Sequence, residues 1–121
     1  MFIRKLLACE EFTAGDNTRL REILHPNKED LALRYSLAHA VLKPGATSYA
    51  HSLSSSEIYY ILEGQGMMYI NNESQVVNVG DTVYIAPNSK QYIKCISDVE
   101  LKFICIVDPA WREDDEIVYK S

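Results

Sequence analysis

Apolar residues recur at every second position along much of this chain, and this period constrains the fold more than any other feature. In the stretch RYSLAHAVL, the residues Leu37, His39 and Val41 fall on one face of an extended segment. In EIYYILEG, the face that carries Glu57 and Tyr59 and the opposite face are both largely apolar or aromatic. Side chains alternate between two faces in a β-strand, so both stretches predict strands, the second one covered on both sides.

Turn-forming residues interrupt these stretches at short intervals. Short strands between turns about 8–12 residues apart indicate an all-β sandwich or barrel, and we expect about nine or ten strands from Phe2 to Asp108. The segment NTRLREILHP leaves two alternatives open, one turn of helix or an edge strand, and Pro26 ends it in either case. The turn signals are Gly64-Gln65-Gly66, Asn71-Asn72, Gly80-Asp81, Pro87-Asn88 and Ser97-Asp98.

Composition argues against two classes of partner. With 121 residues, of which 47% are hydrophobic, the chain is long enough for one domain with one core. Its net charge of -5 argues against a nucleic-acid surface, because phosphate binding needs clustered Lys and Arg. No apolar run approaches the roughly 18 residues that would predict a membrane-spanning helix, so we expect no membrane partner. Cys9, Cys95 and Cys105 show no C-x-x-C spacing, which predicts reduced thiols and a cytoplasmic protein.

Two blocks in the second half of the chain show regular spacings between glycines and polar residues. In the first block, Gly45, His51, Leu53, Glu57 and Gly64 are separated by five, one, three and six residues. The second block begins at Gly80 and continues at the same kind of spacing through Ala86, Asn88, Gln91 and Cys95.

These spacings resemble the two motifs of the cupin superfamily, G-x5-H-x-H-x3,4-E-x6-G and G-x5-P-x-G-x2-H-x3-N. The resemblance covers about residues 33–108 and implies a double-stranded β-helix, the jelly-roll barrel of small single-domain cupins. It implies one cupin domain over residues 1–121, with the core barrel at about 33–108. The N-terminal strands within 1–32 would then serve as a dimer arm, and residues 109–121 would form a C-terminal tail.

The chain departs from the cupin motifs at the positions that hold a metal in the family. The first His and the Glu are present as His51 and Glu57, but Leu53 replaces the second His and Gln91 replaces the His of the second motif. If the strand faces point into the barrel, His51, Glu57 and Gln91 meet in one cavity. We expect this cavity to be lined by Leu53, Tyr59, Ile61, Met68 and Ile93.

Two interpretations of this polar group stay open. In one, His51, Glu57 and Gln91 hold a divalent transition metal (Zn, Mn, Fe or Ni) with water completing the shell. In the other, the three side chains form a hydrogen-bonded group without a metal, since a buried carboxylate needs partners. His39 is a fourth ligand only if its face points inward, and a core or dimer-interface histidine is the simpler interpretation.

The function that follows is a small-molecule-binding cupin, with a metal-dependent enzyme of oxygenase or isomerase type as its catalytic form. Glu57 would then be a ligand or base and Tyr59 an acid. The alternative is a metal-free, non-catalytic binding or sensor module. An isomerase for a phosphorylated substrate would need basic residues, for which Lys90 and Arg34 are available.

Segments outside the motifs carry further expectations. The apolar outer faces of the strands predict a homodimer. The segment from Phe2 to Leu7 could form a strand that crosses to the partner subunit. We expect His25 in an exposed loop. The acidic run Glu113 to Glu116 predicts a solvated tail, in which Trp111 should pack on another part of the chain.

Overall fold

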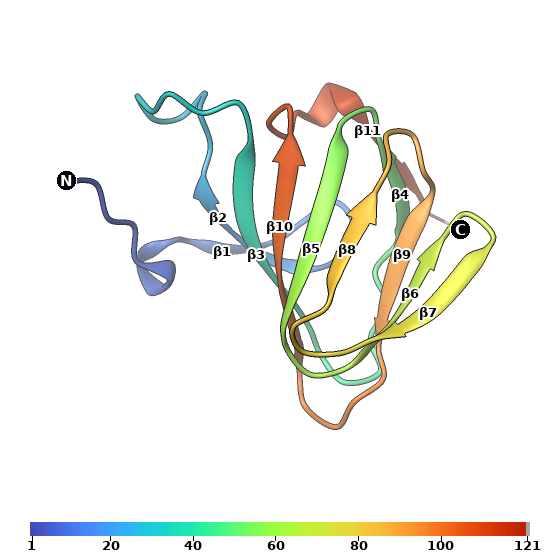
Figure 1. Cartoon of the computed structure of the whole chain (residues 1–121). Helices are drawn as coiled ribbons and strands as arrows, with labels where there is room; N and C mark the ends of the chain where they lie inside the picture. The colour runs from blue at the N-terminus through green and yellow to red at the C-terminus, as the bar shows by residue number, and fades with distance from the viewer. Residues whose placement is uncertain (121) are drawn as a thin grey trace.

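The protein is described by a computed structural model that covers residues 1–120, and it is built from strands (Figure 1). Residues 1–120 form eleven β-strands and two 3-10 turns and contain no α-helix. The elements are η1 (Leu6–Ala8), β1 (Glu11–Thr13), β2 (Arg19–Leu24), β3 (Ser36–Leu42), β4 (Ala50–Leu53), β5 (Ser56–Glu63), β6 (Gly66–Ile70), β7 (Glu73–Val77), β8 (Thr82–Ile85), β9 (Gln91–Cys95), β10 (Leu101–Asp108), η2 (Glu113–Asp115) and β11 (Glu116–Tyr119).

The strands form two antiparallel sheets that face each other. One sheet has the strand order β1-β2-β3-β10-β5-β8, and the other has the order β11-β4-β9-β6-β7. From β3 onward most connections cross from one sheet to the other, which is the arrangement of a jelly-roll barrel. The expectation of an all-β jelly-roll barrel is confirmed.

The two-residue period separates the barrel interior from its surface. On β5 the residues Glu57, Tyr59 and Ile61 are buried, whereas Tyr60 and Leu62 on the opposite face are exposed. Residues of both sheets meet between the layers in one hydrophobic core, as expected for packed sheets. This core consists of Ala40, Leu42, Tyr59, Ile61, Met68, Val77, Ile85, Ile93, Cys95, Leu101, Phe103 and Cys105.

The turns between strands form at the positions that the sequence indicates. Gly64 lies between β5 and β6 with φ +79, and Asn71 lies between β6 and β7 with φ 53. Asn88, which replaces a motif glycine, also takes a left-handed conformation, with φ 67. Asn tolerates this region better than other residues with a Cβ, so the second block keeps the backbone path that its glycine would give.

The two ends of the chain differ from the sequence expectations. The NTRLREILHP segment forms strand β2, which lies between β1 and β3 rather than at an edge. The expected strand from Phe2 to Leu7 is absent from the structure, because Leu6–Ala8 form a 3-10 turn. In Figure 1 the N-terminal residues extend away from the barrel beside β1.

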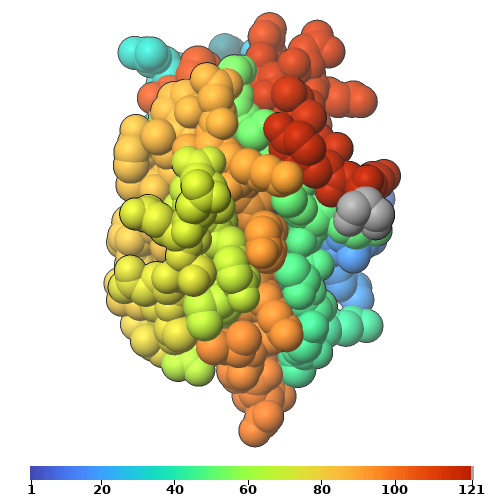
Figure 2. Space-filling view, turned by 90° about the vertical axis from the view of Figure 1, so that its right-hand side faces the viewer, coloured from blue at the N-terminus to red at the C-terminus, as the bar shows by residue number. Residues whose placement is uncertain are grey.

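The C-terminal segment is a part of the barrel wall rather than a solvated tail. Strand β11 pairs with β4 in antiparallel register, with Glu116 opposite Leu53 and Val118 opposite His51. Figure 2 shows the C-terminal residues in red, lying against the green segment that contains β4. The acidic run therefore ends in an ordered strand next to the first motif. No helix in residues 1–120 is long and apolar enough to cross a membrane.

Candidate functional site

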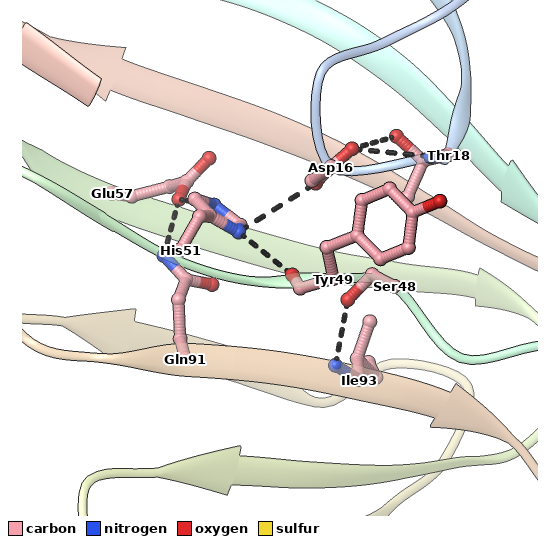
Figure 3. A network of polar contacts seen from close by, with 8 residues as sticks. All are labelled: Asp16, Thr18, Ser48, Tyr49, His51, Glu57, Gln91 and Ile93. Carbon is pink, nitrogen blue, oxygen red and sulfur yellow. Dashed lines mark hydrogen bonds and ion pairs between the residues drawn. The ribbon is translucent and has the colours of Figure 1, made fainter. Parts of the chain in front are cut away.

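Three strands bring the polar motif residues together inside the barrel. His51 on β4 pairs directly with Gln91 on β9, and Glu57 begins β5. The amide Nε2 of Gln91 donates a hydrogen bond of 2.7 Å to Oε1 of Glu57, and Nε2 of His51 lies 3.8 Å from the same oxygen (Figure 3). The three side chains named by the motif spacing thus converge on one point, the carboxylate of Glu57.

A second carboxylate lies on the other side of His51. Oδ2 of Asp16 lies 3.8 Å from Nδ1 of His51, and the same nitrogen lies 3.4 Å from the carbonyl oxygen of Tyr49. The backbone N–H and the hydroxyl of Thr18 donate to Oδ1 of Asp16, at 3.1 and 2.7 Å. These bonds fix the Asp16 carboxylate in the loop between β1 and β2, so that it faces the imidazole.

The surrounding carboxylates keep His51 charged. Its side chain is only 2% exposed, and burial alone would lower its pKa. Glu57, Asp16 and Glu116 together outweigh that effect and raise the pKa of His51 to about 9. The interior of the barrel therefore contains an imidazolium at neutral pH, with two different carboxylates near its two ring nitrogens.

A cavity of about 250 Å³ opens next to this group. Its wall combines apolar and aromatic side chains with a few charged ones, which is the usual composition of a small-molecule site. The lining residues are Phe12, Ala14, Gly15, Asp16, Thr18, Leu20, Glu22, Lys28, Ser36, Ala38, Ala40, His51, Leu53, Glu57, Tyr59, Phe103, Cys105, Val107, Trp111 and Glu116.

The expected pocket residues divide between this cavity and the core. Leu53 and Tyr59 line the cavity. Ile61, Met68 and Ile93 are buried in the hydrophobic core and do not line it. Ile61, Met68 and Ile93 fill the part of the barrel in which the motif spacing predicts a cavity. The cavity is instead lined partly by residues of β2, β3 and β11.

Tyr59 presents a protonated phenol to the cavity. Its ring packs at 4.5 Å, centroid to centroid, on the ring of Phe103. Burial, and secondarily the charge of Glu57, raises the pKa of Tyr59 well above its usual value. The phenol therefore stays neutral at physiological pH and acts as a hydrogen-bond donor rather than as a base.

The other two histidines lie outside the cavity. His39 lies on the outer face of β3, since its neighbours Ala38 and Ala40 line the cavity, and it is not placed as a fourth ligand. Burial lowers the pKa of His39, so it is neutral. His25 is buried, contrary to the expectation of an exposed loop, and its Nε2 donates to the carbonyl oxygen of Trp111 at 2.7 Å.

The side chains do not form a good site for a resident metal. Among residues 1–120, no group of three or more His, Cys, Asp or Glu side chains is arranged to hold a metal ion. Leu53 occupies the position of the second His, and the amide nitrogen of Gln91 faces the carboxylate that a metal would need. The arrangement fits a hydrogen-bonded, charged group better, and the metal at His51, Glu57 and Gln91 stays a prediction.

Three residues that line the cavity lie outside the two motifs and are not predicted by them. Asp16 and Glu116 lie outside both motifs, and nothing in their local sequence indicates a position at an interior cavity. Trp111, the single Trp of the chain, is the one signal for this region, because a Trp in a polar segment usually packs on another part of the chain. Burial raises the pKa of Glu116, and the nearby charge of His51 partly opposes this shift.

Three features define the class of protein to which this chain belongs. They are a two-sheet barrel, an interior cavity and a buried polar group at the positions of the two motifs. The chain belongs to the cupin family, since residues 38–107 match the family model described as Cupin domain. It is 42% identical over 109 residues to the protein MJ1618 of Methanocaldococcus jannaschii, covering 88% of this chain and 86% of that protein.

Solved structures show the same fold at low sequence identity. The predicted oxalate decarboxylase from Thermotoga maritima superposes with a TM-score of 0.78 at 19% identity, covering 89% of this chain and 99% of that one. The nucleoside dehydratase Pac13 from Streptomyces superposes with a TM-score of 0.80 at 20% identity, covering 99% and 92% of the two chains. These similarities establish the fold.

Proposed function

We propose that this cupin binds a small organic molecule in the interior cavity and transfers protons to and from it with His51 and Glu57. One observation carries the proposal: a charged imidazole and a carboxylate face the same cavity, with 3.8 Å between Nε2 of His51 and Oε1 of Glu57. This distance is too long for a hydrogen bond, so the N–H of His51 remains free to donate to a ligand.

Glu57 acts as the general base and His51 as the general acid. Glu57 removes a proton from a carbon next to a ligand carbonyl, while Nε2–H of His51 donates a proton to the carbonyl oxygen. The product is an enol, and both side chains end neutral. Gln91 holds the Glu57 carboxylate in place through its 2.7 Å hydrogen bond, and the Tyr59 phenol is available to donate a second hydrogen bond. No step requires a metal.

The charges and positions of the cavity residues argue against a phosphorylated substrate. Lys90 and Arg34, the basic residues available for a phosphate, do not line the cavity. Lys90 instead lies over the ring of Tyr119, at 4.5 Å from its centroid. An isomerase or dehydratase acting on a carbonyl or hydroxyl compound without a phosphate group fits better, and the likeness to a nucleoside dehydratase supports this class.

Hydrogen exchange tests the proposal directly. The protein is incubated in D2O with neutral aldehydes, ketones and sugars, and loss of the C–H signal next to the carbonyl is followed by NMR. We expect exchange that survives EDTA and that falls at least about a hundredfold in both His51→Gln and Glu57→Gln, the scale of one general acid or base. Binding without exchange would instead support the non-catalytic sensor module, and exchange that needs added metal would contradict the account.

One observation favours the metal site as a second candidate. Oε1 of Gln91, whose residue is only 1% exposed, is buried without a hydrogen-bond partner among residues 1–120. An amide oxygen in this state could accept from a bound water or coordinate a weakly held divalent metal. Protein purified without a tag or chelator distinguishes the candidates: less than about a tenth of an equivalent of Zn, Mn, Fe or Ni after soaking rejects the metal, whereas retained metal that Glu57→Ala removes supports it.

The homodimer and the cytoplasmic location also remain proposals. Support for a dimer comes from the outer face of the first sheet, where Tyr60, Leu62 and Tyr84 are 44%, 41% and 64% exposed. An apolar sheet face of this kind is usually covered by a partner. Light scattering tests it, and a mass near the 13.8 kDa of one chain would contradict it.

A further inference from the structure

The charged side chains of the cavity do not balance. Four acidic residues and two basic ones line it, and the Glu22 carboxylate already pairs with Lys28 at 2.7 Å. His51 is then the single cation facing the remaining three carboxyl groups, which belong to Asp16, Glu57 and Glu116. A partly buried carboxylate without a counterion is destabilising, so the cavity has a place for a further positive charge.

The position of that place follows from the contacts of Glu116. His51 lies 3.8 Å from both Asp16 and Glu57, whereas Glu116 forms no ion pair with any of residues 1–120. Glu116 reaches the cavity from β11 and lies against the loop between β1 and β2, where a Cβ on Gly15 would lie 3.4 Å from its Oε1. Trp111 also lines the cavity. A cavity that offers both a carboxylate and an indole ring is a favourable environment for an ammonium group.

The same cavity also offers a hydrogen-bond donor. His51 is 98% buried, and its Nε2 has no partner within hydrogen-bond distance in the described chain, because Glu57 lies 3.8 Å away. This N–H is therefore suited to an oxygen acceptor of a ligand. Aromatic side chains, including Phe12, Tyr59 and Phe103, form part of the cavity wall.

We infer that the ligand is a small amine that also carries an oxygen acceptor, with its ammonium group bound by Glu116 and Asp16 and its oxygen bound by Nε2–H of His51. This inference rests on the proposed small-molecule function and names the ligand class of that site. The volume of about 250 Å³ corresponds to roughly eight waters of liquid, so the ligand is smaller than a typical drug molecule.

Two matched series of probes test the inference. The first contains tyramine, tyrosol and 4-hydroxyphenylacetate, and the second contains glucosamine, glucose and glucuronate. Within each series the size is similar and the charge changes from positive to neutral to negative. Isothermal titration calorimetry gives the affinities, and two-dimensional NMR of the labelled protein locates the bound probe. We expect the amine of at least one series to bind in the cavity at least about tenfold more tightly than its neutral and anionic counterparts.

Variants separate the cavity charge from the charge of the whole chain. Glu116→Gln keeps the shape of the side chain and should weaken amine binding at least about tenfold while leaving any binding of the neutral probe unchanged. The matched control is Asp114→Asn, which removes the same charge from η2, outside the cavity, and should have no effect. NMR spectra of the free variants report whether the fold is kept, and Asp16→Asn provides a second removal of charge from the same cavity.

The outcomes distinguish this inference from the proposed function. Tighter cavity binding of the neutral or anionic probes, or amine binding that Glu116→Gln and Asp16→Asn leave unchanged, would overturn the amine assignment. Proton exchange with neutral carbonyl compounds would then still support the proposed function. Absence of cavity binding by every probe would overturn the amine inference, and absence of exchange as well would overturn both.

Discussion

Replacement of Gly64 by Ala should destabilise the protein far more than the same change at Gly80. Both glycines have positive φ values, +79 and +90, and a residue with a Cβ in the left-handed region costs about 1–2 kcal/mol. At Gly64 the added Cβ would also lie 2.5 Å from the carbonyl oxygen of Glu100 and 3.0 Å from Cα of Leu101. At Gly80 it would meet no atom within 4 Å.

The contacts of Gly64 set the expected magnitude. Both close atoms belong to the backbone where β10 begins and cannot rotate away, and overpacking of this kind costs about 1–3 kcal/mol. The expected loss in the free energy of unfolding is thus about 2–5 kcal/mol for Gly64→Ala and about 1–2 kcal/mol for Gly80→Ala.

Urea denaturation followed by Trp111 fluorescence and circular dichroism measures the difference. The Gly80 variant serves as the matched control, because it shares the backbone strain and lacks the steric contact. Equal losses for the two variants would refute the steric argument, and a negligible loss at both positions would refute the argument from φ as well.

Three further predictions concern the site. Because folding raises the pKa of His51 from 6.5 to about 9, its charge stabilises the fold fully below pH 6.5, and a contribution of about 3 kcal/mol is lost as the pH rises through 9. Urea midpoints across this range should therefore fall more steeply for the wild type than for His51→Gln, and parallel curves would contradict the shift. Leu53→His should create a site of two His and one carboxylate that retains about one equivalent of Zn or Ni, measured by elemental analysis, and a metal content equal to that of the wild type would contradict the arrangement of β4. Tyr59→Phe keeps the contact with Phe103 and should change stability by less than about 1 kcal/mol, while lowering the exchange rate at least about tenfold; an unchanged rate would remove Tyr59 from the chemistry.

The sequence predicted the barrel well, because its turns depend on local backbone chemistry. Gly64, Gly80 and Asn71 lie at turns that only a few residue types accept, and the two-residue period between them fixes which face is buried. The ends were predicted less well. Residues 19–24 lack a clear period, and the pairing of β11 with β4 joins segments far apart in the sequence, which no local pattern encodes.

In the site, too, the features set by local sequence are predicted and those that depend on long-range contacts are not. The spacing of His51, Glu57 and Gln91 was sufficient to bring them together, because all three lie on strands whose register the motif fixes. Asp16 and Glu116 approach from a loop and from the last strand, so their contribution to the charge of His51 depends on tertiary contacts. The acidic run around Glu116 was interpreted as solvated, since polar composition cannot show which single carboxylate faces inward.

The charge state of His51 is the central claim, and an NMR titration tests it most directly. The protein is labelled with 15N at the histidine side chains, and the two ring-nitrogen shifts of His51 are followed from about pH 5 to about pH 10, with His51→Gln used for assignment. We predict a pKa of about 9 that decreases in both Glu57→Gln and Asp16→Asn. A pKa of 6.5 or below in the wild type would show a neutral imidazole in the cavity and would contradict the proposed proton donor.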